Sequence, residues 1–180
     1  RLQSYLDAHG IANRPHIKTH KIPESAWMQL RAGAVGITCQ KIGEAEAMAA
    51  AGIQDILLPY NIIGAAKLER LVRLARRVTL SVTADSAYTV RGLSAAVQAG
   101  GLTLPVLVEF DSGLQRCGVQ SPAEAAELAL IIARLPGLRF GGLMTYPSNA
   151  QTDSFVRETR TLLRTEGMGV DCVSGGGSPG

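Results

Sequence analysis

The sequence predicts an α/β fold, specifically a (β/α)8 TIM-type barrel that is incomplete in this chain. Short β-branched segments alternate along the 180 residues with amphipathic stretches of helical length, a pattern typical of βαβ units and a parallel sheet. The strand-like segments are almost continuously apolar, which indicates a sheet covered on both faces. An open, doubly wound sheet also has these features, and a full barrel typically needs about 250 residues.

The barrel is favoured because polar residues recur where the predicted strands end. Barrel enzymes place their active sites at the carboxyl ends of their strands. The residues found there are Lys18, Thr38, Tyr60, Glu109, Tyr146 and Ser174. The chain has no linker or low-complexity tract, so residues 1–180 are expected to form part of a single barrel domain.

The elements follow from local pattern. Strands are expected at residues 15–18, 34–39, 55–59, 78–82, 105–110, 140–146 and 171–174. Helices are expected at residues 23–32, 42–51, 65–76, 86–99, 122–135 and 152–166. Ser121, followed by a proline and by Glu124, predicts the start of one helix. Gly33, Gly52 and Gly100 stand where a left-handed residue would end a helix.

Composition limits the functional classes. An apolar fraction of 46% with 18% charged residues is ordinary for a soluble globular chain. The net charge of +3 is small and scattered, so no nucleic acid partner is expected. No apolar run approaches the roughly 18–20 residues of a membrane span. Three cysteines form neither a CxxC pair nor an even disulfide framework, which favours a reduced, cytoplasmic setting.

The segment PHIKTHK, residues 15–21, holds the most reactive candidate. Its proline and isoleucine favour an extended backbone, which would point His16 and Lys18 to the same side. A lysine on the inner side of a strand is partly desolvated, so its pKa falls and its amine can attack an aldehyde to form an imine. A basic loop at the edge of the domain is the alternative interpretation.

Three other segments could bind a ligand. VEFDSGLQRCGV, residues 108–119, is a strand ending in a glycine-punctuated turn that holds Arg116, and a pair between Arg116 and Asp111 is the alternative to a ligand contact. GGLMTY, residues 141–146, combines paired glycines with Tyr146, which suggests close packing beneath a ring. VSGGGSPG, residues 173–180, places a glycine run after a strand, where backbone N–H groups can converge on an anion. A flexible loop is the alternative there.

These motifs, with the segment GAVGITCQKIGEAEAMAAAGIQDILLPY, resemble one group of enzymes that depend on pyridoxal 5'-phosphate (PLP). The group is that of the D-threonine aldolases and D-serine dehydratases, within the fold-type III (alanine racemase-like) PLP enzymes. The similarity runs over essentially the whole chain. It implies an eight-stranded barrel followed by a C-terminal β-domain, which is not expected among these residues.

The resemblance also implies roles for particular residues. The first lysine of the KTHK string binds PLP as a Schiff base in this group, which corresponds to Lys18 and not to Lys21. Arg116 corresponds to the residue that bonds the PLP phenolate oxygen, and Tyr146 to a tyrosine beside the cofactor. The residues expected to bind the phosphate are Ser174, Gly175, Gly176, Gly177 and Ser178.

Other positions are expected to modify the chemistry. Alanine racemase has an arginine against the pyridine nitrogen, just ahead of its phosphate loop, whereas Asp171 to Val173 stand here. A ring nitrogen without a cationic partner would weaken PLP as an electron sink and disfavour racemisation. Secondary candidates for substrate contact, proton transfer or lining of the pocket are His16, His20, Thr38 and Gln40.

The resemblance implies a PLP-dependent lyase that cleaves a small D-β-hydroxy-α-amino acid into glycine and an aldehyde, as D-threonine aldolase does. One alternative is a D-serine dehydratase-like β-elimination, and another is a non-catalytic PLP-binding protein or a truncated fragment. Both lyase branches use a divalent metal held by the C-terminal domain, so no metal ligand is expected in this chain. Their sites are completed by a partner subunit, which implies a homodimer for the full-length protein.

Overall fold

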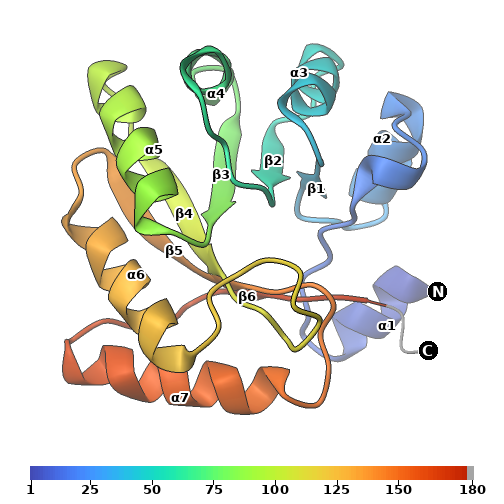
Figure 1. Ribbon diagram of the computed structural model, residues 1–180. Helices are drawn as coiled ribbons and strands as arrows, with labels where there is room; N and C mark the ends of the chain where they lie inside the picture. Colours follow the sequence, from blue (N-terminus) through green and yellow to red (C-terminus); the bar gives the residue numbers. More distant parts are fainter. Residues whose placement is uncertain (178–180) are drawn as a thin grey trace.

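The computed structural model describes residues 1–177 and contains a sheet of six parallel strands in the order β1-β2-β3-β4-β5-β6. Each strand therefore pairs with the next one along the chain, as in a barrel. Figure 1 shows the sheet curled, with helices along its outer face, so that it forms about half of a barrel. The strands are β1 (Ile37–Thr38), β2 (Asp55–Leu58), β3 (Thr79–Ala84), β4 (Leu104–Glu109), β5 (Leu138–Met144) and β6 (Val173–Ser174).

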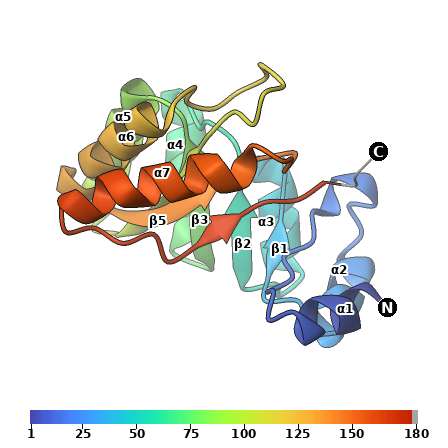
Figure 2. The ribbon, with the colours of Figure 1, turned by 90° about the horizontal axis from the view of Figure 1, so that it is seen from below.

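Seven α-helices accompany the strands in the described part of the chain. The six that follow the predicted pattern are α2 (Pro23–Arg31), α3 (Ile42–Ala50), α4 (Ala65–Ala75), α5 (Ala87–Ala99), α6 (Pro122–Arg134) and α7 (Thr152–Thr165). The seventh, α1 (Leu2–Ala8), was not predicted, and none of its residues is buried. Figure 2 shows α1 near α2, at the β1 end of the sheet.

Side chains alternate between the two faces of the sheet, and this alternation creates two cores. Val106 and Val108 of β4 belong to the large core between strands and helices. Leu107 lies between them and joins Leu57 and Met144 in a separate buried cluster on the inside of the curl. Glu109, two positions after Leu107, faces the same inner side. It is the last residue of β4 and so lies at the carboxyl end of the strand, where barrel enzymes have their active sites.

Six of the seven predicted strands are confirmed, although β1 and β6 are short. The prediction of a strand at residues 15–18 is wrong. There the chain makes a single parallel bridge, between His16 and Thr38, and then turns into a 3-10 helix, η1 (Ile17–Thr19). The turn forms because the His16 side chain accepts a hydrogen bond from the Lys18 backbone N–H, an interaction that competes with an extended ladder.

Most predicted helix ends are confirmed. The Ser121 hydroxyl accepts a hydrogen bond from the Glu124 backbone N–H at 3.2 Å and so caps α6. Gly33 and Gly52 have the left-handed conformation, with φ of 115° and 91°. The same prediction for Gly100 is wrong: its φ is −81°, and the left-handed residue is the following glycine, at φ 65°. Helix α5 still ends at Ala99, as predicted, and only the left-handed residue lies one position later.

Candidate active site at the carboxyl ends of the strands

Three segments far apart in the sequence meet around the ring of Tyr146. The Lys18 Nζ atom lies 4.8 Å from the centre of this ring, and the Arg116 Cζ atom lies 5.7 Å from it. Tyr146 follows β5 and Arg116 follows β4, while Lys18 follows the parallel bridge that His16 makes with Thr38, the last residue of β1. All three therefore lie at the carboxyl ends of the parallel strands, which is where the sequence places the site.

Lys18 reaches this place from a turn and not from a strand. Ile17 is fully buried beneath the turn, whereas Lys18 is exposed and extends over Tyr146. The expectation that Lys18 is a partly desolvated residue on the inner side of a strand is therefore wrong. Its position depends on the 3-10 geometry, which anchors one side chain in the core and turns the next one outward.

Neither cation has an acidic partner. Within residues 1–177, no carboxylate oxygen lies within 4.0 Å of the Lys18 amine or of the Arg116 guanidinium. The alternative pairing of Arg116 with Asp111 does not occur. The Asp111 carboxylate instead accepts backbone N–H groups of the same turn, at 2.9, 3.0 and 2.8 Å, from Gly113, Leu114 and Gln115. Two unpaired cations beside one aromatic ring form a site suited to an anionic ligand.

A buried carboxylate lies beneath the arginine turn. Glu109, at the end of β4, is only 6% exposed and accepts hydrogen bonds from Cys117 Sγ at 3.1 Å and from Thr83 Oγ1 at 3.4 Å. Burial raises the pKa of Glu109, and the bond from Cys117 opposes that rise. Burial, reinforced by Glu109, raises the pKa of the Cys117 thiol to about 11, so this thiol is protonated at neutral pH.

The glycine loop after β6 is held by a residue that the sequence analysis missed. The Ser148 hydroxyl accepts a hydrogen bond from the Gly176 N–H at 3.0 Å, and the Ser148 N–H donates to the Gly176 carbonyl oxygen at 2.7 Å. Ser148 lies two residues after Tyr146, so one loop supplies the aromatic ring and supports the glycines. Of the residues expected to bind phosphate, Ser174 ends β6, residues 175–177 follow it, and Ser178 lies outside the described residues.

The paired glycines of β5 have a role different from the predicted one. Gly142 has a φ of 118°, and the carbonyl oxygen of Cys172 lies where its side chain would be. The close packing is therefore between the backbones of β5 and the segment entering β6, and not beneath a ligand ring. This approach allows β6 to pair with β5 and brings the glycine loop against Pro147 and Ser148, directly after Tyr146.

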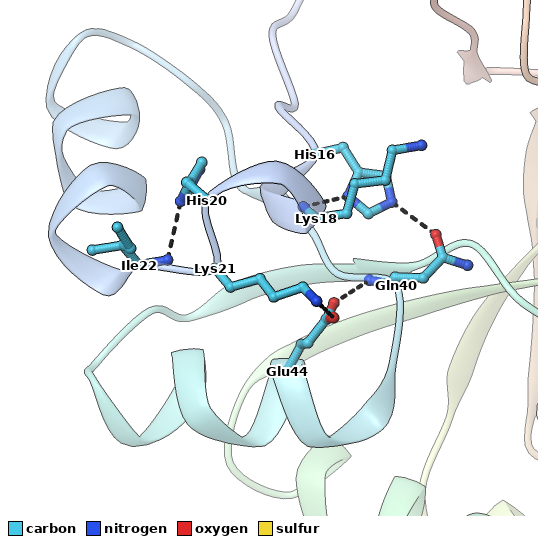
Figure 3. A network of polar contacts seen from close by, with 7 residues as sticks. All are labelled: His16, Lys18, His20, Lys21, Ile22, Gln40 and Glu44. Atoms are coloured by element: carbon cyan, nitrogen blue, oxygen red, sulfur yellow. Dashed lines mark hydrogen bonds and ion pairs between the residues drawn. The ribbon is translucent and has the colours of Figure 1, made fainter.

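A network of polar side chains surrounds the Lys18 turn (Figure 3). His16 Nδ1 accepts the Lys18 backbone N–H at 3.1 Å, and His16 Nε2 lies 3.2 Å from Gln40 Oε1. The Gln40 backbone N–H donates to Glu44 Oε2 at 2.9 Å, and the other Glu44 oxygen lies 3.5 Å from Lys21 Nζ. Two of the secondary candidates, His16 and Gln40, are thus bonded to each other next to Lys18.

The other two secondary candidates have different environments. His20 Nδ1 accepts the Ile22 backbone N–H at 3.1 Å, and its buried Nε2 atom has no hydrogen-bond partner within residues 1–177. Thr38 is buried at 7% exposure and forms the bridge to His16 through its backbone. Thr38 therefore supports the turn from below, while His20 packs toward α2.

The chemistry of these groups fits PLP. A lysine amine without an acidic partner can attach to the aldehyde of the cofactor, and an unpaired guanidinium matches its phenolate. The glycine loop fits a phosphate because the space beside Gly176 is open: a Cβ atom there would meet no atom within 4 Å. Among residues 1–177, no three His, Cys, Asp or Glu side chains gather where they could hold a metal ion.

The helices in the described part of the chain are too short or too polar to cross a membrane.

Comparison with known proteins identifies the relatives of this chain. It is 41% identical over 192 residues to D-threonine aldolase of Arthrobacter sp., covering 98% of this chain and 50% of that protein. It is 34% identical over 177 residues to D-threo-3-hydroxyaspartate dehydratase of Delftia sp. (strain HT23), covering 96% and 45% respectively. The crystal structure of D-threonine aldolase from Filomicrobium marinum matches with a TM-score of 0.92 and 35% identity, covering 97% of this chain and 51% of that one.

The chain thus spans about half the length of the relatives that it matches. Residues 2–180 also match the family described as alanine racemase, N-terminal domain. The curled parallel sheet, the match over nearly all residues and the similar structure agree with one another. The chain therefore belongs to the alanine racemase N-terminal domain family, within the fold-type III PLP enzymes.

Proposed function

We propose that the full-length protein is a PLP-dependent lyase that cleaves a small D-β-hydroxy-α-amino acid, as a D-threonine aldolase does. The observation that carries the proposal is the unpaired Lys18 amine beside Tyr146 and Arg116. Family membership supports the cofactor, and the 41% identical aldolase supports the reaction. The substrate class comes from the names of the relatives and not from the geometry of this half of the protein.

The proposed reaction divides the substrate at its Cα–Cβ bond. The β-hydroxyl group loses its proton and becomes the carbonyl group of an aldehyde. The electron pair of the broken bond stays on Cα, which takes up a proton to give glycine. PLP, when bound, supplies the electron sink that makes this cleavage possible.

The residues of this chain bind and orient the cofactor in the proposal. Lys18 would hold PLP covalently through its amine. Arg116 would donate hydrogen bonds to the phenolate oxygen and so favour its ionised form. Tyr146 would lie beside the cofactor. The loop formed by Ser174, Gly175, Gly176 and Gly177 would hold the phosphate.

A β-elimination is the second candidate, because the chain is also 34% identical to a D-threo-3-hydroxyaspartate dehydratase. Elimination would release the β-hydroxyl as water and leave, after hydrolysis, a keto acid and ammonia. The two reactions differ in which bond to Cβ is broken. The resemblance implies that the C-terminal domain holds the divalent metal of both reactions, so neither account assigns a metal ligand to residues 1–177.

The test uses full-length protein with PLP and a divalent cation on D-threonine, D-3-hydroxyaspartate and D-serine in separate assays. Glycine and an aldehyde from either of the first two support the aldolase. A keto acid and ammonia, without glycine, assign the dehydratase. The Lys18→Ala variant should be inactive, whereas Lys67→Ala, on the exposed face of α4, should match the wild type. Activity that survives Lys18→Ala would contradict the proposal.

A further inference from the structure

The PHIKTHK string contains two lysines in one turn, and their surroundings differ. Lys21 Nζ lies 3.5 Å from Glu44 Oε1, on helix α3. Lys18 has no carboxylate within ion-pair distance among residues 1–177 and lies over the Tyr146 ring. Figure 3 shows the two side chains leaving the turn in different directions. The ion pair holds the Lys21 amine at α3, so of the two lysine amines only that of Lys18 lies beside the Tyr146 ring.

Glu44 also acts on the other side of the turn. The second oxygen of Glu44 accepts a hydrogen bond from the Gln40 backbone N–H at 2.9 Å. The side-chain oxygen of Gln40 in turn lies 3.2 Å from His16 Nε2. Glu44 is largely buried, with 13% of its side chain exposed, whereas the Lys21 side chain is 56% exposed. One carboxylate therefore contacts Lys21 directly and approaches Lys18 through two residues.

The contacts of His16 define which nitrogen carries its proton. Nδ1 accepts the backbone N–H of Lys18, so it holds a lone pair and no hydrogen. Nε2 must then carry the proton and donate it to the Gln40 side-chain oxygen. Both ring nitrogens are engaged in this neutral form, which leaves none for a proton shuttle. In a charged imidazolium, Nδ1 would also carry a hydrogen and could not accept the Lys18 N–H. The hydrogen bond that shapes the turn would then be lost.

From these contacts we propose that Glu44, Gln40 and His16 are positioning residues that select Lys18 over Lys21 for covalent attachment of PLP. Glu44 holds the Lys21 ammonium away from the site. Gln40 keeps His16 in its Nε2–H tautomer, and His16 shapes the turn that presents Lys18. This inference rests on the proposed function only in naming PLP as the group that Lys18 receives.

The charges around His16 agree with this role. Burial lowers the pKa of His16, and the neighbouring Lys18 cation lowers it further, while the Gln40 hydrogen bond and the Glu44 carboxylate oppose the shift. The uncharged ring is therefore the dominant form at neutral pH. Lys18 belongs to η1 and Glu44 to α3, so the pKa of His16 depends on charges from both elements.

One experiment measures where PLP attaches. Full-length protein is incubated with PLP, reduced with borohydride and mapped by peptide mass spectrometry. We expect His16→Ala to weaken PLP binding at Lys18 about five- to tenfold, the usual effect of losing one backbone cap. His16→Asn should recover most of this loss, because its side-chain oxygen can still accept the Lys18 N–H. His9→Gln, at the exposed residue that follows helix α1, is the matched control.

A second pair of variants isolates the ion pair. Glu44→Gln can still accept the Gln40 N–H but no longer holds Lys21, so the fraction of label on Lys21 should rise several-fold. Glu69→Gln removes the exposed pair with Arg73 on α4 and should leave the labelling pattern unchanged. Selective 15N labelling of histidine should report the Nε2–H tautomer for His16 without any cofactor present.

The outcomes separate the two proposals. Wild-type protein that takes no label on Lys18 would overturn the proposed function, while the histidine tautomer can still be measured. Label on Lys18 with an Nδ1–H or charged His16 would overturn the positioning role. So would equal binding in wild type and His16→Ala, or an Asn variant that binds no better than Ala. If His16→Ala does not fold, the Asn variant and Glu44→Gln decide the question.

Discussion

Within residues 1–177, the Arg116 side chain makes no ion pair with a carboxylate. This side chain is exposed, and its Cζ atom lies 5.7 Å from the centre of the Tyr146 ring. An exposed side chain of this kind contributes little to folding. Such an arginine is available to a ligand, and its removal should alter the ligand more than the fold.

Arg116→Ala should therefore shift the absorbance maximum of bound PLP, because the phenolate loses its donor. The free energy of unfolding without PLP should change by less than about 0.5 kcal/mol. Absorbance spectra and denaturant titrations of both proteins measure the two effects. An unchanged spectrum would place the phenolate elsewhere.

Unlike Arg116, the buried Glu109 should affect the stability of the fold. Its folded-state pKa is raised, chiefly by burial, so the folded protein binds this proton more tightly than the unfolded chain does. The stabilising contribution is complete below the unfolded pKa, about 4.3, and is lost as the pH rises through the folded pKa. At neutral pH the ionised group therefore costs stability.

Glu109→Gln should raise the free energy of unfolding at pH 7, by on the order of 1 kcal/mol, and should remove this part of the pH dependence. Gln keeps an acceptor for Cys117, and its amide can donate to Thr83. Melting curves between pH 4 and 8 test this, with the exposed Glu127→Gln on α6 as the control. A less stable variant at pH 7 would mean that the charged hydrogen bonds outweigh burial.

The glycine loop is the element in which local conformation and ligand binding can be separated. Gly176 has no left-handed φ and open space beside it, whereas Gly177 has a φ of 137° and lies against Pro147. A side chain at position 176 is therefore compatible with the fold. At position 177 it would strain the backbone with or without a ligand.

Gly176→Val should fold normally and bind PLP at least about tenfold more weakly, because its methyl groups obstruct the approach of the phosphate to the backbone. Binding of pyridoxal, which lacks the phosphate, should change much less. Fluorescence titration with both compounds makes the comparison. Equal loss for both would show that the loop does not bind the phosphate.

At the scale of the molecule, the cofactor site joins the first and last strands. Lys18 precedes β1 and the glycine loop follows β6, with the other four strands between them in the sheet. A ligand bonded at both places would connect the two edges of the curled sheet. It would also bind only the folded state, because the unfolded chain does not bring these segments together.

PLP should therefore stabilise the whole molecule. At a free concentration 100 times its dissociation constant, it should add about 2.7 kcal/mol to the free energy of unfolding. Hydrogen exchange should slow both near residues 16–20 and near residues 174–177. Protection at only one of these segments would mean that the ligand does not connect the two edges.

Much of the fold could be predicted because its signals are local. A helix start such as Ser121 and the apolar periodicity of a helix or strand are each set by residues that are close together in the sequence. The spacing of the strands follows from these local patterns. The strand at residues 15–18 was the failure, because an extended pattern and a tight turn differ there by one side-chain bond from His16. The sequence alone marks Lys18, Arg116, Tyr146 and the glycine string as a ligand site through motif and resemblance.

The tertiary structure decided which groups face one another. His16 meets Gln40 across 24 residues, and Ser148 meets Gly176 across 28, and neither pairing has a signal in the local sequence. The difference between Lys18 and Lys21 likewise depends on Glu44, which a separate helix brings to the turn. The physical reason is that hydrogen bonds, burial and charge act over a few ångströms in space. Only the packed chain places residues distant in sequence within that range.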